Sequence, residues 1–382
     1  TAVEDTIPDI KRAKELNIPI KHRSDLLADI FSSHKYNIAV GGTSGKSTVT
    51  AMIGYILDKS AKSPLVINGA LLKNYENQSG IPNVILNNGE YCVIEADESD
   101  GSIEKYTPFI SVINNISLDH KSIEELQQLF GTFAQKAKRG VVLNKDCPNS
   151  LAIAHINKNT LTFSITDSSA DFYAENITAI QNGTSYTYKD QQYTLNLIGK
   201  FNVSNAMCAV ACCSLLGIDA HTSCKILESF LGTKRRLEVL GQTNNITVID
   251  DFAHNPDKVN ASMSALKSYK GRLILMFQPH GFSPMRLMGK EIIASFNRHM
   301  DDQDILLIPE IFFAGGTVKR DISSLDLVNH AIELGSNAKF FPTRDELKQH
   351  ILEIAKPNDR IVLMGARDNS ITDMGFELLE KL

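Results

Sequence analysis

The sequence predicts an α/β protein with parallel sheets in two domains. From Asn37 onward, apolar stretches of strand length alternate with helical patterns, as in a parallel sheet that has helices on both faces. Short polar strands interrupt this series after Asn149, and a second series begins near Gly232. The chain has 382 residues, whereas one domain typically has about 150. We therefore predict a central domain over residues 35–231 and a C-terminal domain over residues 232–382.

The first 34 residues contain too little apolar sequence for a core of their own. Two short helical patterns, PDIKRAKELNIPI and RSDLLADIFSS, lie around the extended stretch IPIKH. We interpret residues 1–34 as the last part of a domain and the linker that follows it.

The central domain begins with NIAVGGTSGKSTVTAMIGYIL, residues 37–57, which predicts a buried strand, a tight turn and a helix opened by Lys46. Backbone N–H groups of such a turn point inward, and the helix N-terminus adds partial positive charge, so the turn suits a phosphate. The full P-loop pattern has glycine where this chain has Val40. Glycines lie instead at Gly41, Gly42 and Gly45. We predict that Lys46 reaches the outer phosphates and Ser47 holds Mg²⁺; the alternative is an ordinary tight turn.

Polar groups follow the next two predicted strands. The stretch YCVIEADES ends in four carboxylates, those of Glu95, Asp97, Glu98 and Asp100. FISVINNI leads to Asp119 and His120. The carboxyl ends of parallel strands meet at one edge of a sheet, where α/β sites form, and carboxylate oxygens suit Mg²⁺. The alternative is a solvated acidic loop.

The rest of the chain completes the two domains. LTFSI, SYTYKD and QYTLNLIG predict a small antiparallel insertion, and FNVSNAMCAVACCSLLGI predicts a helix. NITVIDDFA, RLILMFQP, DILLIPE, AKFFPT and DRIVLMGA then predict about five strand–helix repeats, which make the C-terminal part a doubly wound domain.

Composition narrows the functional class. The net charge is −5, and there is no Lys/Arg block and no tryptophan, which argues against nucleic-acid or anionic-membrane binding. The six cysteines form no CxxC pair and are interpreted as core residues in a reducing cytosol. No apolar run approaches the ~18 residues of a membrane span, and the N-terminus lacks a signal-peptide pattern. We expect a soluble, cytoplasmic protein.

Seven motifs together resemble the Mur ligase family. They are GTSGKST, EADESD, NNISLDH, GKFNVSNAMCAV, GTKRRLEV, DDFAHNP and FQPHGF, in that order. The resemblance runs from about Thr1 to the C-terminus and implies a P-loop-type central domain followed by a Rossmann-like domain. It also implies an ATP-dependent, ADP-forming ligase that makes amide bonds in peptidoglycan precursors, acting on a UDP-sugar nucleotide and an amino acid or short peptide.

The resemblance assigns a role to each matching residue. It implies that ATP is bound by Gly42, Thr43, Ser44, Gly45, Lys46, Ser47, Thr48, Asn202, Asn205, Arg236 and Asp251. It implies that the divalent metal is held by Ser47, Glu95 and His120. It implies that catalysis depends on Lys46, Arg236, His254 and His280. Within this set, the asparagines hold adenine and Arg236 reaches the γ-phosphate. The alternatives are that Asn202 is a helix N-cap and Arg236 a surface cation.

Three departures from the family pattern bear on substrates. Phe201 stands where the family usually has a histidine, which leaves the contact to the base edge open. Gly281 and Pro284 stand where the L-alanine-adding branch usually has arginines. Because arginine grips a carboxylate through two parallel hydrogen bonds, we predict weak use of free L-alanine and preference for another amine, such as a peptide. The alternative is that Arg286, or Lys319 and Arg320, restores the grip.

The resemblance implies an N-terminal UDP-binding domain with a glycine-rich turn of its own, and we expect it to be largely absent from this sequence, because no further glycine-rich turn precedes Gly41. We expect the sequence to be a fragment or the protein to use a different donor. Our first choice is addition of L-alanine to UDP-N-acetylmuramate through an acyl phosphate. The alternatives are recycling of murein tripeptide onto the same sugar nucleotide, or a nucleotide-binding regulatory protein without ligase activity. We expect a monomer or dimer.

Overall fold

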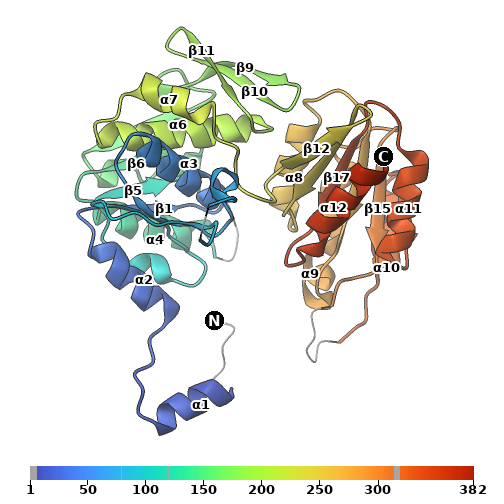
Figure 1. The fold of residues 1–382 in the computed structure, drawn as a ribbon, viewed down its shortest axis with the longest axis horizontal. Coiled ribbons are helices and arrows are strands. Elements are labelled where there is room, and N and C mark those ends of the chain that lie inside the picture. The colour runs from blue at the N-terminus through green and yellow to red at the C-terminus, as the bar shows by residue number, and fades with distance from the viewer. Residues whose placement is uncertain (1–6, 79, 119–120, 314–318) are drawn as a thin grey trace.

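A computed structural model describes residues 7–78, 80–118, 121–313 and 319–382. Figure 1 shows two α/β bodies side by side, joined by one segment between helix α7 (Ala220–Leu227) and strand β12 (Glu238–Thr243). The two helices predicted near the N-terminus are present, as α1 (Pro8–Glu15) and α2 (Arg23–Ser32). Among the described residues, none of the helices has the length and apolar character that a membrane crossing requires.

The central domain is built on an eight-stranded sheet of order β3-β2-β4-β1-β5-β6-β7-β8. Its strands are β1 (Tyr36–Gly41), β2 (Leu65–Ile67), β3 (Val84–Ile85), β4 (Tyr91–Glu95), β5 (Ile110–Ile113), β6 (Gly140–Asn144), β7 (Thr160–Ser164) and β8 (Phe172–Tyr173). Apart from β3, every pairing is parallel, which confirms the predicted sheet. The assignment of LTFSI to the antiparallel insertion was wrong, because β7 pairs in parallel with β6.

Helices cover both faces of this sheet. One face packs against α3 (Lys46–Lys59), α6 (Lys200–Leu215) and α7, and the other against α2 and α4 (Ile123–Gln135). Helix α3 comes close to β2 because Gly54 has no side chain; a Cβ there would lie 2.6 Å from a methyl group of Val66. A short helix, α5 (Pro148–Leu151), and three 3₁₀ turns, η1 (Lys73–Tyr75), η2 (Ser102–Lys105) and η3 (Ala154–Ile156), complete the connections.

A three-stranded antiparallel sheet forms the insertion that the sequence predicts. Its strands are β9 (Glu175–Ile180), β10 (Gly183–Tyr188) and β11 (Gln191–Leu195). Tyrosines of β10 and β11 join the core that α6 and α7 form, so this sheet caps that side of the domain (Figure 1).

The C-terminal domain has a six-stranded sheet of order β12-β13-β17-β14-β15-β16. The further strands are β13 (Ile246–Asp251), β14 (Leu273–Phe277), β15 (Ile305–Pro309), β16 (Ala338–Phe341) and β17 (Arg360–Met364). Helices α8 (Pro256–Leu266), α9 (Phe282–Asn297) and α10 (Ser324–Glu333) cover one face, and α11 (Arg344–Ile354) and α12 (Ser370–Lys381) cover the other. The predicted doubly wound domain of five repeats is confirmed; the antiparallel edge strand β12 was not foreseen.

The segment that joins the domains is fixed to the central domain by several contacts, among them a strand bridge and an ion pair. Leu72 and Thr233 form an antiparallel bridge. The Lys73 Nζ lies 3.0 Å from the carboxylate of Glu238, which is almost fully buried. The division at residues 231 and 232 stays a prediction, and these contacts lie at it.

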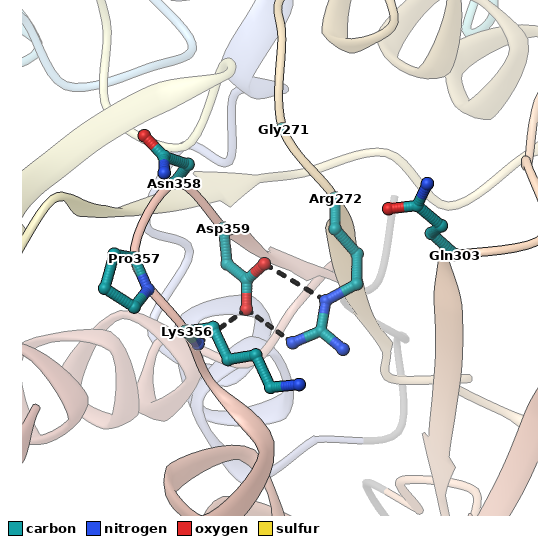
Figure 2. A pocket seen from close by; sticks show the side chains of 7 residues that line it. All are labelled: Gly271, Arg272, Gln303, Lys356, Pro357, Asn358 and Asp359. Atoms are coloured by element: carbon teal, nitrogen blue, oxygen red, sulfur yellow. Dashed lines mark hydrogen bonds and ion pairs between the residues drawn. The ribbon is translucent and has the colours of Figure 1, made fainter.

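The amino ends of the C-terminal strands carry a separate, buried ion pair at the edge of a small pocket (Figure 2). Arg272 and Asp359 stand directly before β14 and β17, and their side chains meet through two hydrogen bonds of 3.0 and 2.5 Å. Arg272 also donates to the carbonyl of Ile354. This pair ties two central strands together at the end of the sheet opposite the carboxyl ends.

Replacing Arg272 with alanine should destabilise the C-terminal domain, because Asp359 would stay buried without its cation. The loss expected for a broken buried pair is about 3 kcal/mol in the free energy of unfolding, measured by urea denaturation. Arg298→Ala is the matched control, since its hydrogen bond to Asn260 is exposed. Equal losses in the two variants would contradict the structural role of the pair.

Candidate functional site

The carboxyl ends of strands from both sheets face a shared cavity of about 430 Å³. The cavity is lined by Thr43, Ser44, Gly45, Lys46, Ser47, Thr48, Glu95, Asn114, Asn115, Phe201, Asn205, Arg236, Leu237, Asp251, Ala253, Asp257, Lys258, Ala261 and Ser262. It therefore brings the glycine-rich turn of the central domain to residues of the C-terminal domain. Of the residues assigned from the sequence, Gly42, Asn202, His254 and His280 are not among the lining residues.

Two asparagines at the end of β5 hold the glycine-rich turn in shape. The Asn115 carboxamide oxygen accepts hydrogen bonds from the Ser44 N–H and the Thr43 hydroxyl, both at 2.8 Å. The Asn114 carboxamide donates to the Ser44 carbonyl at 3.0 Å. Gly45 has φ +80°, and a Cβ there would lie 2.3 Å from the Asn114 amide nitrogen. The turn thus requires glycine at this position, for both its conformation and its space.

Lys46 already has a buried counter-charge, the carboxylate of Glu98. Its Nζ lies 2.8 Å from the Glu98 carboxylate and donates to the Gly42 carbonyl at the same distance. Burial raises the pKa of Glu98, and attraction to Lys46 opposes that shift. A phosphate that binds Lys46 must therefore compete with a buried carboxylate for the same cation.

The acidic run after β4 divides into two pairs. Glu95 lines the cavity and accepts the Gly69 N–H at 2.5 Å, and Glu98 binds Lys46. Asp97 and Asp100 instead accept backbone N–H groups two residues on and stabilise turns. The solvated-loop alternative therefore does not describe Glu95 and Glu98.

Glu95 and Ser47 share the cavity and are suited in type to hold Mg²⁺, through carboxylate and hydroxyl oxygens. The third expected ligand, His120, lies outside the described residues. In the part of the chain that is described, no three His, Cys, Asp or Glu side chains gather as a metal cluster.

The asparagines of α6 form a buried chain of amides. Asn202 donates to the Ile198 carbonyl at 2.8 Å, and its oxygen accepts from the Asn205 amide at 3.2 Å. The Asn205 oxygen in turn accepts from Asn114 at 2.9 Å. Asn202 lies inside the first turn of α6, whose N-cap is Gly199, so the N-cap alternative is wrong. The amides link α6 to the phosphate turn, while Phe201 lines the cavity itself.

Arg236 enters the cavity from the segment that joins the domains. Its neighbours Arg235 and Leu237 both have positive φ, 58° and 46°, which side chains with a Cβ rarely adopt. Its guanidinium lies 4.8 Å from the centre of the Phe252 ring. Burial lowers the pKa of Arg236, and attraction to Asp251 and then Glu95 opposes the shift. Arg236 is therefore a charged group held between the two domains and not a surface cation.

Asp251 and two histidines lie at the carboxyl ends of C-terminal strands. Asp251 is buried, accepts a hydrogen bond from the Ser262 hydroxyl, and has its pKa raised by burial. The rings of His254 and His280 are 5.5 Å apart, centre to centre. Burial and the charge of Lys258 lower the pKa of His254 to about 4. Burial also lowers the pKa of His280, whose Nδ1 has no hydrogen-bond partner among the described residues. Both imidazoles are neutral at pH 7.

Sequence reasoning missed three residues of this site. Asn114 and Asn115 were passed over in favour of Asp119 and His120 from the same motif, and Glu98 was noted only as part of the acidic run. The asparagines could have been identified from their place directly after β5, because this strand lies next to β1, which leads into the glycine-rich turn.

Comparisons with known proteins agree with this geometry. Residues 40–213 match the Mur ligase middle domain, and residues 235–367 match the Mur ligase glutamate ligase domain. A UDP-N-acetylmuramate–L-alanine ligase from Dictyoglomus turgidum is 35% identical over 97% of this chain and 80% of its own length. One from Caldanaerobacter subterraneus is 32% identical over 100% of this chain and 83% of its own length.

Solved structures are similar as well. A UDP-N-acetylmuramate–alanine ligase from Thermotoga maritima has a TM-score of 0.81 and 25% identity, over 99% of this chain and 83% of that one. A murein peptide ligase from Psychrobacter arcticus has a TM-score of 0.66 and 22% identity, over 100% and 84% of the two chains, and supports the fold alone.

Stability of the C-terminal domain should fall as the pH falls from about 6.5 to about 4, because the pKa of His254 is about 4 in the fold and about 6.5 when unfolded. In this window the unfolded chain binds the extra proton, so the free energy of unfolding decreases by at most about 1.4 kcal/mol per pH unit. His254→Gln should flatten the dependence, measured by urea denaturation at several pH values. His155→Gln, at an exposed position, should not; an unchanged slope in His254→Gln would contradict the assignment.

Proposed function

This chain belongs to the Mur ligase family and is an ATP-dependent, amide-bond-forming ligase, and on that premise we propose that it joins L-alanine to UDP-N-acetylmuramate. The observation that carries the proposal is the shared cavity, where a phosphate turn with Lys46 faces Arg236 from the other domain. The substrates named for the two ligases at 35% and 32% identity support this choice of donor and acceptor.

Activation of the donor carboxylate is the first step of the proposed reaction. A carboxylate is a poor acyl donor, so one of its oxygens attacks the γ-phosphorus of ATP, giving an acyl phosphate and ADP. Phosphoryl transfer requires mainly positioning and neutralisation of charge. Lys46 supplies one positive charge from the turn, and Arg236 supplies a second from the joining segment. Backbone N–H groups at the start of α3 add a favourable dipole.

Mg²⁺ belongs to the proposed site as a partner of the phosphates. Ser47 and Glu95 are the described residues that would hold it, and His120 is the further ligand that the family resemblance implies. When bound, the ion supplies charge neutralisation at the phosphate oxygens.

Amide formation is the second step. The acceptor's neutral amine attacks the acyl carbon, phosphate leaves, and the amine gives up a proton. His280 is neutral at pH 7 and lies beside His254 at the strand ends, so it can accept that proton; His254, with a pKa of about 4, is a weaker base. Both domains line the cavity, so closure of one domain on the other would limit water near the acyl phosphate.

Another acceptor is favoured by one observation at the start of α9. Gly281 has φ +73° and is the N-cap of this helix, and Pro284 lies in its first turn. Neither residue can grip a carboxylate, so a short peptide, as in murein recycling, is the second candidate acceptor.

We expect ADP release to require both UDP-N-acetylmuramate and an amine acceptor. The kcat/KM for L-alanine, compared with that for a short peptide, decides between the proposed acceptor and the second candidate. ADP formation is measured with each acceptor and with neither. A higher kcat/KM for the peptide would contradict L-alanine as the acceptor, and nucleotide binding without turnover would favour a regulatory protein.

Lys46→Ala should reduce ATP turnover at least about 100-fold, the loss of about 3 kcal/mol expected when a contact to transferring phosphate is removed. Since that variant leaves Glu98 buried without a cation, Lys46→Met combined with Glu98→Gln separates catalysis from folding. ADP formation and thermal unfolding are measured together. Near-normal turnover in either variant would contradict the phosphate-binding role.

Glu95→Ala and His120→Ala should each raise the Mg²⁺ concentration needed for half-maximal activity, because each removes an expected ligand. Asp97→Asn is the control from the same acidic run, since its carboxylate stabilises a turn. Titration of ADP formation with MgCl₂ gives the result. An unchanged Mg²⁺ requirement in both alanine variants would remove these residues from the metal site.

A further inference from the structure

Arg367 has a backbone conformation that is unusual for its residue type. It lies just beyond the end of β17 and has φ 63°, in the left-handed region. This conformation is strained for a residue with a Cβ, and residues of this kind gather at functional sites. The conformation therefore suggests that Arg367 has a functional role.

The surrounding loop is fixed firmly enough to impose this conformation. On one side, the Gly365 N–H donates to the Asp251 carbonyl at 3.0 Å, and Arg235 donates to the Gly365 carbonyl at 2.6 Å. On the other side, Arg344 forms an ion pair of 2.5 Å with Asp368, the residue after Arg367. The loop is held on both sides of Arg367, so its neighbours, and not its own conformational preference, impose the positive φ.

Strand order places Arg367 at the same edge of the sheet as the two site histidines. The last residues of β13, β17 and β14 pair across the sheet as Asp251, Met364 and Phe277. Three residues beyond this row stand His254, Arg367 and His280, one on each strand end. Because β17 lies between β13 and β14, Arg367 follows the strand between those that carry the histidines. After burial, its charge is the next cause that lowers the pKa of His280.

The guanidinium of Arg367 is available to a ligand. The residue is exposed, and within the described part of the chain its side chain has no hydrogen-bond or ion-pair partner. A guanidinium offers five N–H donors in a planar fork, which matches a carboxylate in two parallel hydrogen bonds.

The other cations near α9 are engaged. Arg286 donates to Asp321, and Lys319 lies 3.3 Å from the same carboxylate. Arg320 lies 4.0 Å from the centre of the Phe313 ring. These are the three residues that could have replaced the missing arginines at 281 and 284, and two of them already share one counter-ion.

We propose that Arg367 is a specificity-determining residue that binds the carboxylate of the acceptor amino acid and so presents its amine to the acyl phosphate beside His254 and His280. This inference rests on the proposed function and deepens it by naming the acceptor's anion site. An acceptor held by its carboxylate at this strand end has its amine close to both neutral imidazoles. The grip that Gly281 and Pro284 cannot provide comes from a different strand end.

L-Alaninamide is the probe for this contact, because it keeps the amine and methyl group but lacks the carboxylate. We expect Arg367→Ala to lower kcat/KM for L-alanine about 10- to 100-fold, as for loss of a bidentate charged contact. KM for ATP and for UDP-N-acetylmuramate should stay within twofold, and kcat/KM for L-alaninamide should not change. Arg367→Lys should restore only part of the L-alanine activity, and Arg320→Ala should leave it near the wild-type value.

Arg367→Gly should change stability and activity in opposite directions. Glycine adopts positive φ without strain, so we expect this variant to unfold at a higher temperature than wild type while it loses L-alanine activity. Asp190→Gly is the matched control, since Asp190 has φ 65° in the β10–β11 turn, remote in sequence and fold from the strand ends. It should leave kcat/KM unchanged. A purely structural role for Arg367 would not raise stability and lower acceptor use together.

The outcomes separate this inference from the proposed function. Wild-type protein that forms no ADP with either acceptor contradicts the proposed function and, with it, the acceptor site. If the wild type turns over but Arg367→Ala keeps the wild-type ratio of kcat/KM for L-alanine to kcat/KM for L-alaninamide, the role of Arg367 is contradicted and the proposed function is not. A raised KM for ATP in that variant, or loss of L-alanine use in Arg320→Ala instead, would also overturn it.

Discussion

The ion pair between Lys73 and Glu238 anchors the joining segment to the central domain, and the position of Arg236 in the site depends on this anchor. One Glu238 oxygen lies 3.0 Å from Lys73, and the other accepts the Arg235 N–H at 2.8 Å. The same short segment then turns through two left-handed residues, Arg235 and Leu237, with Arg236 between them. Because breaking a buried pair is costly, this anchor holds Arg236 in the cavity that both domains line.

Parallel sheets give the arrangement its chemistry. All parallel strands of a sheet end at one edge, so two such sheets that face each other by those edges bring loops from both domains to one place. The central domain contributes a turn that binds phosphate, with Lys46 and a buried counter-ion, Glu98. The C-terminal domain contributes Arg236 and Asp251 to the cavity, and its neutral histidines, His254 and His280, lie at its strand ends but are not among the lining residues. Activation of the carboxylate and attack by the amine can therefore occur in one cavity that both domains line, with each domain supplying part of the charge and proton chemistry.

Much of this could be predicted from the sequence, and the failures have physical causes. Strongly apolar strands and the glycine-rich turn were identified because burial and phosphate binding constrain residue type. Strand β7 was misassigned because TLTFS alternates polar and apolar residues like a half-exposed antiparallel strand, although it extends a parallel sheet. The adenine contact expected of the α6 asparagines stays a prediction; the sequence did not show that both also form hydrogen bonds within the protein. Arg367 could not be identified, since positive φ depends on how neighbouring loops hold it and not on its residue type.

The central claim is that the two domains together activate the donor carboxylate as an acyl phosphate. Transfer of an oxygen atom from the donor carboxylate to the released phosphate tests this claim most directly. UDP-N-acetylmuramate carrying ¹⁸O in its carboxylate is incubated with the protein, ATP, Mg²⁺ and acceptor, and the released phosphate is analysed by ³¹P NMR. If the two domains assemble an acyl phosphate in the shared cavity, each phosphate released with amide formation contains one ¹⁸O atom, and Arg236→Ala greatly slows its appearance. Amide formation with unlabelled phosphate would contradict the account.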